Sequence, residues 1–131
     1  MALELLGLDY EAQKIVLRYR DKDSETAKQA HKMRSTVAYG LERFWGERLR
    51  LEGHKASYWQ DVWKTLADIL NPAGIVLPDA NADTDKNDSD RIEAVTQELW
   101  TTFPIEQRKV ALAVLTEFCD CLVWWTQRYK H

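Results

Sequence analysis

The chain has 131 residues and a formal net charge of −3, and 30% of its residues are charged. A single domain of this length buries about two thirds of the surface of its unfolded chain, which excludes a small scaffold that depends on disulfides. Five glycines and three prolines leave few interruptions in the sequence, and this scarcity favours long helices. We therefore expect one all-α domain over residues 1–131, a bundle of about five helices around a central C-terminal helix.

The N-terminus bears on the compartment in which the protein works. Residues 1–8 carry no basic segment and are too short for the apolar part of a signal peptide, so we expect a cytoplasmic protein. Cys119 and Cys121 lie two positions apart on a predicted helix and point about 200° away from each other. That divergence prevents a disulfide between them, and we expect both to be small buried apolar residues.

Apolar residues at helical spacing predict the first two segments of the bundle. Asp9 is expected to cap a helix that runs through about Arg20. Asp23 or Ser24 is expected to cap a second, long segment that reaches Glu52.

A further helix is predicted over residues 58–70. Ser57 and Gln60 have the spacing of a capping box, in which each side chain satisfies a backbone N–H of the first turn. Trp59 and Trp63 share the inward face of this helix, so we expect both in the core.

An acidic stretch follows that helix. The apolar run over 75–77 predicts a short extended segment across the core, and residues 78–90 contain so few apolar side chains that they predict a solvated acidic loop. Asp88 or Ser89 is then expected to cap a helix through about Trp100.

The central helix is expected over residues 104–129. Its apolar arc is wider than a surface helix needs, which predicts contacts on most sides or burial in a dimer. The most apolar part, residues 110–125, contains two acids and is shorter than the roughly 20 residues of a membrane span. The innermost positions are predicted to be Ala111, Leu115, Phe118 and Leu122.

Charge is distributed unevenly along the chain. Residues 14–34 contain seven basic and three acidic residues, whereas residues 79–98 contain seven acidic and two basic ones. Helices present basic residues at i, i+4 spacing to phosphates, although such faces are most often only solvated. The candidate RNA-backbone contacts, called the basic region below, are Lys14, Arg18, Lys28, Lys32 and Arg34.

Trp124 is the candidate contact with a protein partner, since aromatic residues are enriched at binding hot spots. On the central helix it shares a polar strip with Glu117 and Asp120, so we expect it to be the most exposed of the six tryptophans. Glu117 and Asp120 could alternatively act as an acid/base pair, but a polar strip on an apolar helix is the simpler interpretation.

Two further patterns have a functional and a plain interpretation. Oxygen ligands alternate from Asp79 to Asp90 as in a calcium loop, but Thr84 replaces the glycine and Asp90 the bidentate glutamate that such a loop needs. Arg48 and His54 have the loose spacing of a ribonuclease pair, which chance also produces. We expect no catalytic residue, no metal and no cofactor.

The C-terminal pattern Leu115-Thr116, Trp125 and Arg128-Tyr129 resembles the end of the small helical subunit of type III-B CRISPR effector (Cmr) complexes. The stretch from Tyr39 to Leu41 with the helix over 58–70 is similar to the middle of that family. The resemblance implies a non-catalytic helical subunit that contacts neighbouring subunits and the RNA backbone. A helical homodimer or adaptor without nucleic acid, and a ribonuclease of the HEPN class using Arg48 and His54, are the alternatives.

Overall fold

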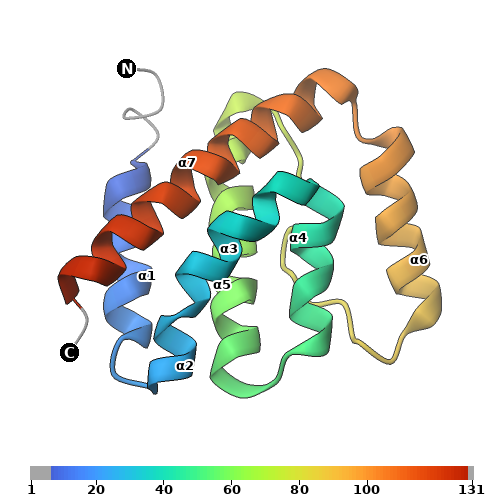
Figure 1. Cartoon of the computed structure of the whole chain (residues 1–131). Helices are drawn as coiled ribbons and strands as arrows, with labels where there is room; N and C mark the ends of the chain where they lie inside the picture. Colours follow the sequence, from blue (N-terminus) through green and yellow to red (C-terminus); the bar gives the residue numbers. More distant parts are fainter. Residues whose placement is uncertain (1–6, 130–131) are drawn as a thin grey trace.

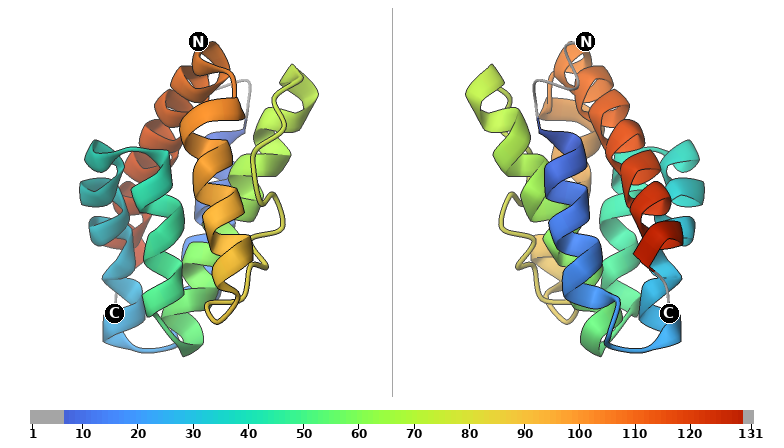
Figure 2. Two further views of the ribbon diagram at one scale, coloured as in Figure 1. Left: turned by 90° about the vertical axis from the view of Figure 1, so that its right-hand side faces the viewer. Right: turned by 90° about the vertical axis from the view of Figure 1, so that its left-hand side faces the viewer.

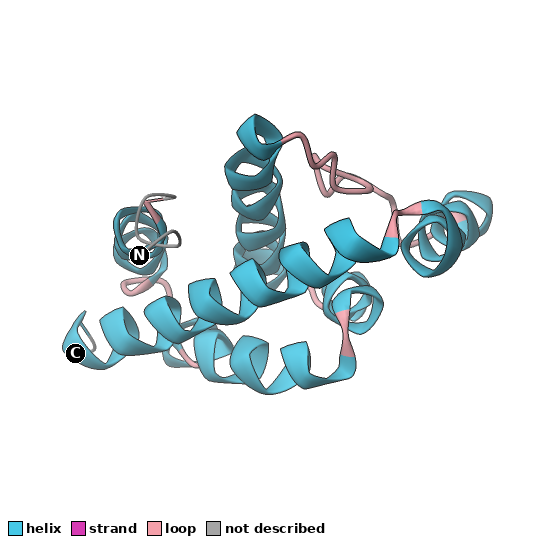
Figure 3. Ribbon diagram, turned by 90° about the horizontal axis from the view of Figure 1, so that it is seen from above, coloured by secondary structure: helices cyan, strands magenta, loops and turns pink. Residues whose placement is uncertain are grey.

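The computed structural model describes residues 7–129, and this part of the chain contains helices, turns and loops but no strand (Figure 3). The all-α prediction is therefore confirmed. The N-terminal segment considered for a signal peptide lies outside the described residues except for its last two positions. The α-helices are α1 (Leu8–Tyr19), α2 (Ser24–Ala27), α3 (Gln29–Thr36), α4 (Leu41–Glu47), α5 (Gly53–Leu70), α6 (Ser89–Gln97) and α7 (Ile105–Tyr129).

Helix α7 runs diagonally across the molecule and contacts α1, α3, α4 and α5 (Figure 1). Side views show α1 and α6 at opposite ends of the bundle (Figure 2). Among the described helices, α7 alone has the length and composition that would let it cross a membrane, but its contacts with four other helices are those of a core helix. Its buried residues are Ala111, Val114, Leu115, Phe118, Cys119, Leu122 and Thr126.

Aromatic residues of α5 pack against α1 and α4 in the core of the bundle. Tyr58 stacks on Tyr19 of α1 with ring centroids 4.6 Å apart, and Trp59 packs on Phe44 of α4 at 4.8 Å. The indole N–H of Trp59 donates to the side-chain oxygen of Gln29 at 2.8 Å, which satisfies both polar groups inside the core. Both Trp59 and Trp63 are buried, as the sequence predicted.

The segment predicted to reach Glu52 is not one helix but three, so the prediction of a continuous helix was wrong, although the sequence left a bend at Gly40 open. Asp23 does cap its start, because its carboxylate accepts the backbone N–H of Thr26 at 2.7 Å, but the capped helix α2 ends at Ala27. Helix α3 then ends in a 3-10 turn (Val37–Tyr39) and at Gly40, whose φ of 97° lies outside the range that other residues readily adopt. A second 3-10 turn (Arg48–Arg50) ends α4.

Two predicted helix starts were also wrong. Helix α5 begins at Gly53, after the extended residue Glu52, so Ser57 lies inside the helix and forms no capping box. Helix α1 begins at Leu8, after Gly7, and Asp9 lies in its first turn. The Asp9 carboxylate instead accepts the indole N–H of Trp125 in α7 at 3.3 Å. A contact between the two ends of the chain thus replaces the local cap.

The burial of α7 predicts a large effect of Leu115→Ala. Leu115 is completely buried, so the substitution removes apolar contacts and leaves a cavity, and the free energy of unfolding should fall by about 2–5 kcal/mol. Val110→Ala on the exposed side of the same helix, and Asp83→Ala in the exposed part of the loop, should change it by less than about 0.5 kcal/mol. Urea denaturation measures all three variants. Equal midpoints for Leu115→Ala and Val110→Ala would contradict the orientation of α7.

Candidate functional site

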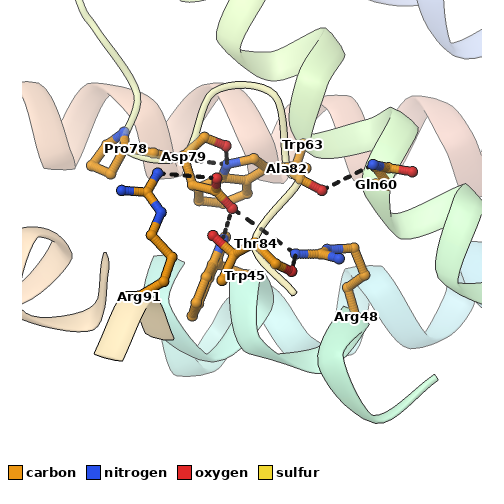
Figure 4. A network of polar contacts seen from close by, with 9 residues as sticks. All are labelled: Trp45, Arg48, Gln60, Trp63, Pro78, Asp79, Ala82, Thr84 and Arg91. Atoms are coloured by element: carbon orange, nitrogen blue, oxygen red, sulfur yellow. Dashed lines mark hydrogen bonds and ion pairs between the residues drawn. The ribbon is translucent and has the colours of Figure 1, made fainter. Parts of the chain in front are cut away.

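The acidic loop is anchored to the core by the carboxylate of Asp79 (Figure 4). One oxygen accepts the indole N–H of Trp45 at 2.9 Å and lies 4.0 Å from the guanidinium of Arg48. The other lies 3.5 Å from the guanidinium of Arg91, and the side chain of Asp79 is 1% exposed. A loop residue therefore joins α4, the turn after it and α6.

The backbone of the same loop is held by side chains of α5 and of the turn after α4. Trp63 donates its indole N–H to the carbonyls of Pro78 and Asp79 at 3.1 and 3.0 Å. Gln60 donates to the carbonyl of Ala82, and Arg48 to that of Thr84. The prediction of a solvated loop over 78–90 was therefore wrong for the buried residues Pro78, Asp79, Ala82 and Thr84 and correct for the exposed residues 85–88. Ser89 and Asp90 are exposed but already belong to α6.

Asp79 carries a negative charge in this environment. Burial alone would raise the pKa of its carboxyl group, but the bond from Trp45 and the charges of Arg91 and Arg48 outweigh burial and lower that pKa. These contacts also use the oxygens that would have to face a calcium ion. Among residues 7–129, no three side chains of the metal-binding types lie close enough together to hold a metal ion.

Arg48 and His54 have different surroundings. The Arg48 side chain is 15% exposed and is engaged by the loop through Thr84 and Asp79. His54 is exposed on the first turn of α5, and its charge, after the stronger effect of the Thr26 N–H, helps to lower the pKa of Asp23. Arg48 is thus largely buried and held by the loop, whereas His54 is exposed on a different element.

Most members of the basic region are paired with carboxylates. Within the described chain, Lys32 is exposed and has no carboxylate partner. The Arg18 and Arg34 pairs cross to different helices, α5 and α7. The pairs are Lys14 with Glu11 at 3.3 Å, Arg18 with Asp61 at 2.9 Å, Lys28 with Glu25 at 3.3 Å and Arg34 with Asp120 at 2.5 Å.

A hollow of about 580 Å³ lies where the turn after α1 meets α2, α3 and the end of α7. Arg20, Lys28 and His31 bring cationic or titratable groups to it, and Asp21 and Asp23 bring carboxylates. Lys28 is the one member of the basic region among its lining residues. The hollow therefore presents mixed charge rather than a purely basic surface.

Trp124 belongs to a second hollow, of about 320 Å³, between the start of α1 and the C-terminal half of α7. Its five lining residues, called the Trp124 surface below, are Asp9, Asp120, Cys121, Trp124 and Trp125. The predicted contact residues Trp124 and Asp120 are therefore close together. Glu117 is exposed one turn before them on α7.

Trp124 is not the most exposed tryptophan, which corrects the sequence prediction. Trp124 is 46% exposed, whereas Trp100 is 54% exposed. Trp100 lies in a π-helical turn (Glu98–Thr102) that follows α6, and the wider turn directs it outward while Leu99 is buried. No pattern in the sequence predicted this π-helical turn.

Three members of the Trp124 surface were not predicted to lie there. Asp9 was expected to cap a helix, Cys121 was expected to be buried but is only partly buried, and Trp125 entered only through the family resemblance. The bond between Asp9 and Trp125 joins positions 116 residues apart, and only the aromatic and acidic composition of α7 pointed to this area.

No protein-family model, no curated protein and no solved structure matches this chain. Its function therefore has to be inferred from the residues themselves.

The buried carboxylate predicts a pH-dependent effect of Asp79→Asn. The asparagine keeps an acceptor for Trp45 and tolerates the positive φ of 49°, but it loses the attraction to Arg48 and Arg91. At pH 7 the free energy of unfolding should fall by about 2 kcal/mol. The folded-state pKa of Asp79 lies below its ordinary value of 3.8, so the stabilisation is present above that value and disappears as the pH falls through the folded-state pKa.

Urea denaturation between pH 7 and pH of about 2 measures this difference. The difference should shrink as the pH falls through the folded-state pKa of Asp79, because the side chain at position 79 is then neutral in both proteins. Asp83→Asn, at an exposed position of the same loop, is the control and should leave stability unchanged at every pH. A difference that does not change with pH would contradict a charged Asp79 in the folded protein.

Proposed function

We propose that the protein is a non-catalytic helical subunit that binds a neighbouring protein through the Trp124 surface. The single observation that carries this proposal is the exposure of Trp124 beside a hollow, on a helix that is otherwise the core of the bundle. A large aromatic side chain left in water on a rigid helix is typical of a binding hot spot. The two carboxylates beside it supply polar contacts around an aromatic centre, as in protein interfaces.

The side chains around Trp124 hold it in place. Its ring meets that of Trp125 edge to face with centroids 4.6 Å apart, and Trp125 in turn stacks on Tyr129 at 5.3 Å. The guanidinium of Arg128 lies 3.7 Å from the centroid of the Trp124 ring. Because these contacts fix the ring before binding, Trp124 loses little side-chain entropy when a partner docks on it.

A CRISPR ribonucleoprotein effector of type III-B is the assembly that we propose for this subunit. Supporting it are the all-helical fold and the position of the whole pattern Leu115-Thr116, Trp125 and Arg128-Tyr129 on α7. Several of these residues have packing roles, since Leu115 is buried and Trp125 stacks on Tyr129. The resemblance therefore bears on architecture and assembly rather than on chemistry.

Contact with the RNA backbone is a second candidate function. It is favoured by three exposed residues, Lys28 between α2 and α3 and His31 and Lys32 on α3, of which Lys28 and His31 line the 580 Å³ hollow. Lys28 would exchange Glu25 for a phosphate, while Lys32 has no internal ion pair to break within the described chain. Such contacts fix the position of RNA without reading its sequence.

Trp124→Ala tests the protein-binding function. A partner captured with the tagged protein, identified by mass spectrometry and then purified, should bind the variant about 30-fold more weakly, the loss typical of a hot-spot residue. Trp100→Ala removes an equally exposed tryptophan outside the Trp124 surface and should leave the affinity unchanged. Equal losses for both variants would contradict the proposal. If sedimentation instead shows a homodimer that Trp124→Ala dissociates, the homodimer alternative is correct.

Lys28→Glu with Lys32→Glu tests the RNA contact. Binding of RNA by the assembled complex should weaken for unrelated sequences alike, and wild-type affinity should fall steeply with rising salt, because neutralised phosphates release counterions. Lys86→Glu with Lys109→Glu makes the same charge change at two exposed lysines that are also paired with glutamates, and should have little effect. Equal gel shifts for the two double variants would remove the basic region from RNA binding, and RNA cleavage that His54→Ala abolishes would favour the ribonuclease alternative.

A further inference from the structure

The Trp124 surface combines two aromatic rings with two carboxylates around one hollow. Trp124 and Trp125 contribute the rings, and Asp9 of α1 and Asp120 of α7 contribute the carboxylates. Asp9 is placed there by the indole N–H of Trp125, which donates to it at 3.3 Å. Aromatic faces and carboxylates have one preference in common, which is for a cation.

The pKa of the Cys121 thiol depends on the burial and the charges around this hollow. Burial, then a hydrogen bond to Asp9, and then the charges of Asp9, Glu117 and Asp120 raise the pKa of that thiol to about 12. Each of these carboxylates opposes a second negative charge at the sulfur atom. Burial, the largest of these causes, disfavours any charge, but the carboxylates would favour a positive charge brought to the same place.

Two arginines of the protein itself already contact residues of the Trp124 surface. Arg128 stacks over the ring of Trp124 at 3.7 Å, and Arg34 of α3 pairs with Asp120 at 2.5 Å. Asp9 has no such cation, since its described partners are the indole of Trp125 and the thiol of Cys121. One carboxylate of the hollow is thus left for a cation from outside.

We propose that the Trp124 surface recognises an arginine side chain presented by the partner protein, with the guanidinium between Trp124, Trp125 and Asp9. This inference rests on the proposed function, which it deepens by naming the chemistry of the contact. The hollow of about 320 Å³ is at the small end of ligand sites, a size suited to one side chain rather than to a folded element.

The geometry favours arginine over lysine. A planar guanidinium can lie on an indole while its edge donates to a carboxylate, and it gives up its hydration more readily than an ammonium group does. Two tryptophan rings and a carboxylate at the wall of one hollow match both of these properties. Lysine would use the charge but not the ring faces to the same extent.

N-acetyl-arginine amide is the probe for this inference. In a titration followed by the indole N–H resonances, those of Trp124 and Trp125 should shift in a saturable way while those of the buried Trp59 and Trp63 do not. N-acetyl-citrulline amide, which has the same shape without the charge, should cause no saturable shift, and N-acetyl-lysine amide should bind more weakly. Asp9→Asn with Asp120→Asn should weaken arginine amide binding about tenfold.

Trp100→Leu is the matched control, because it removes an exposed tryptophan without touching the hollow, and it should leave the titration unchanged. Trp124→Leu should weaken binding, with circular dichroism checking that each variant is folded. Equal binding of citrulline or lysine amide, no saturable shift with arginine amide, or no effect of the double asparagine variant would each overturn the inference.

The two proposals fail in different ways. If Trp124→Ala weakens binding of the partner but the double asparagine variant does not, the protein-binding function stands and arginine recognition is wrong. If neither change affects the partner, both are wrong. Self-association of the protein that is lost in the double asparagine variant, without arginine amide binding, would assign the surface to a second copy of the chain and overturn the inference.

Discussion

Burial of one face of α7 is the constraint on which the rest of the structure depends. This 25-residue helix contacts α1, α3, α4 and α5, so segments that are distant along the sequence are placed by a single element. Burying Leu115, Phe118 and Leu122 fixes the rotation of the helix about its axis. The opposite side, with Asp120 and Trp124, must then face outward. The core of the bundle and its candidate binding surface are two faces of one helix.

A second set of contacts, polar rather than apolar, holds the loop that contains Asp79. The carboxylate of Asp79 and the indoles of Trp45 and Trp63 hold a loop that has few apolar residues of its own. A buried charge is tolerated there because Arg48 and Arg91 lie beside it and Trp45 donates to it. The first part of the loop is consequently packed against the core through Asp79, whereas the acidic residues from Asp83 onward are exposed.

Structural features that depend on residues close together in the sequence were predicted. Features that depend on residues far apart in the sequence were missed. The caps at Asp23 and Asp88 were predicted, because each accepts an N–H three residues ahead. The burial of Asp79 was missed, since its partner Trp45 lies 34 positions away and acidic loops are usually solvated. At the candidate site, the periodicity of α7 predicted an outward Trp124 beside Asp120. It could not show that α1 brings Asp9 to the same hollow, because that requires knowing how the two helices pack.

The ion pair between Arg34 and Asp120 has a consequence for how selective the Trp124 surface is. Arg34 already neutralises Asp120. A second guanidinium that arrives nearby therefore gains less Coulomb energy than it would beside an unpaired carboxylate. A cation that offers only its charge therefore gains little binding free energy there. A cation that also covers the tryptophan rings gains more. A partner that displaced Arg34 would break this ion pair while the buried residues Ala30 and Met33 kept α3 packed in the core, so the displacement would cost little stability.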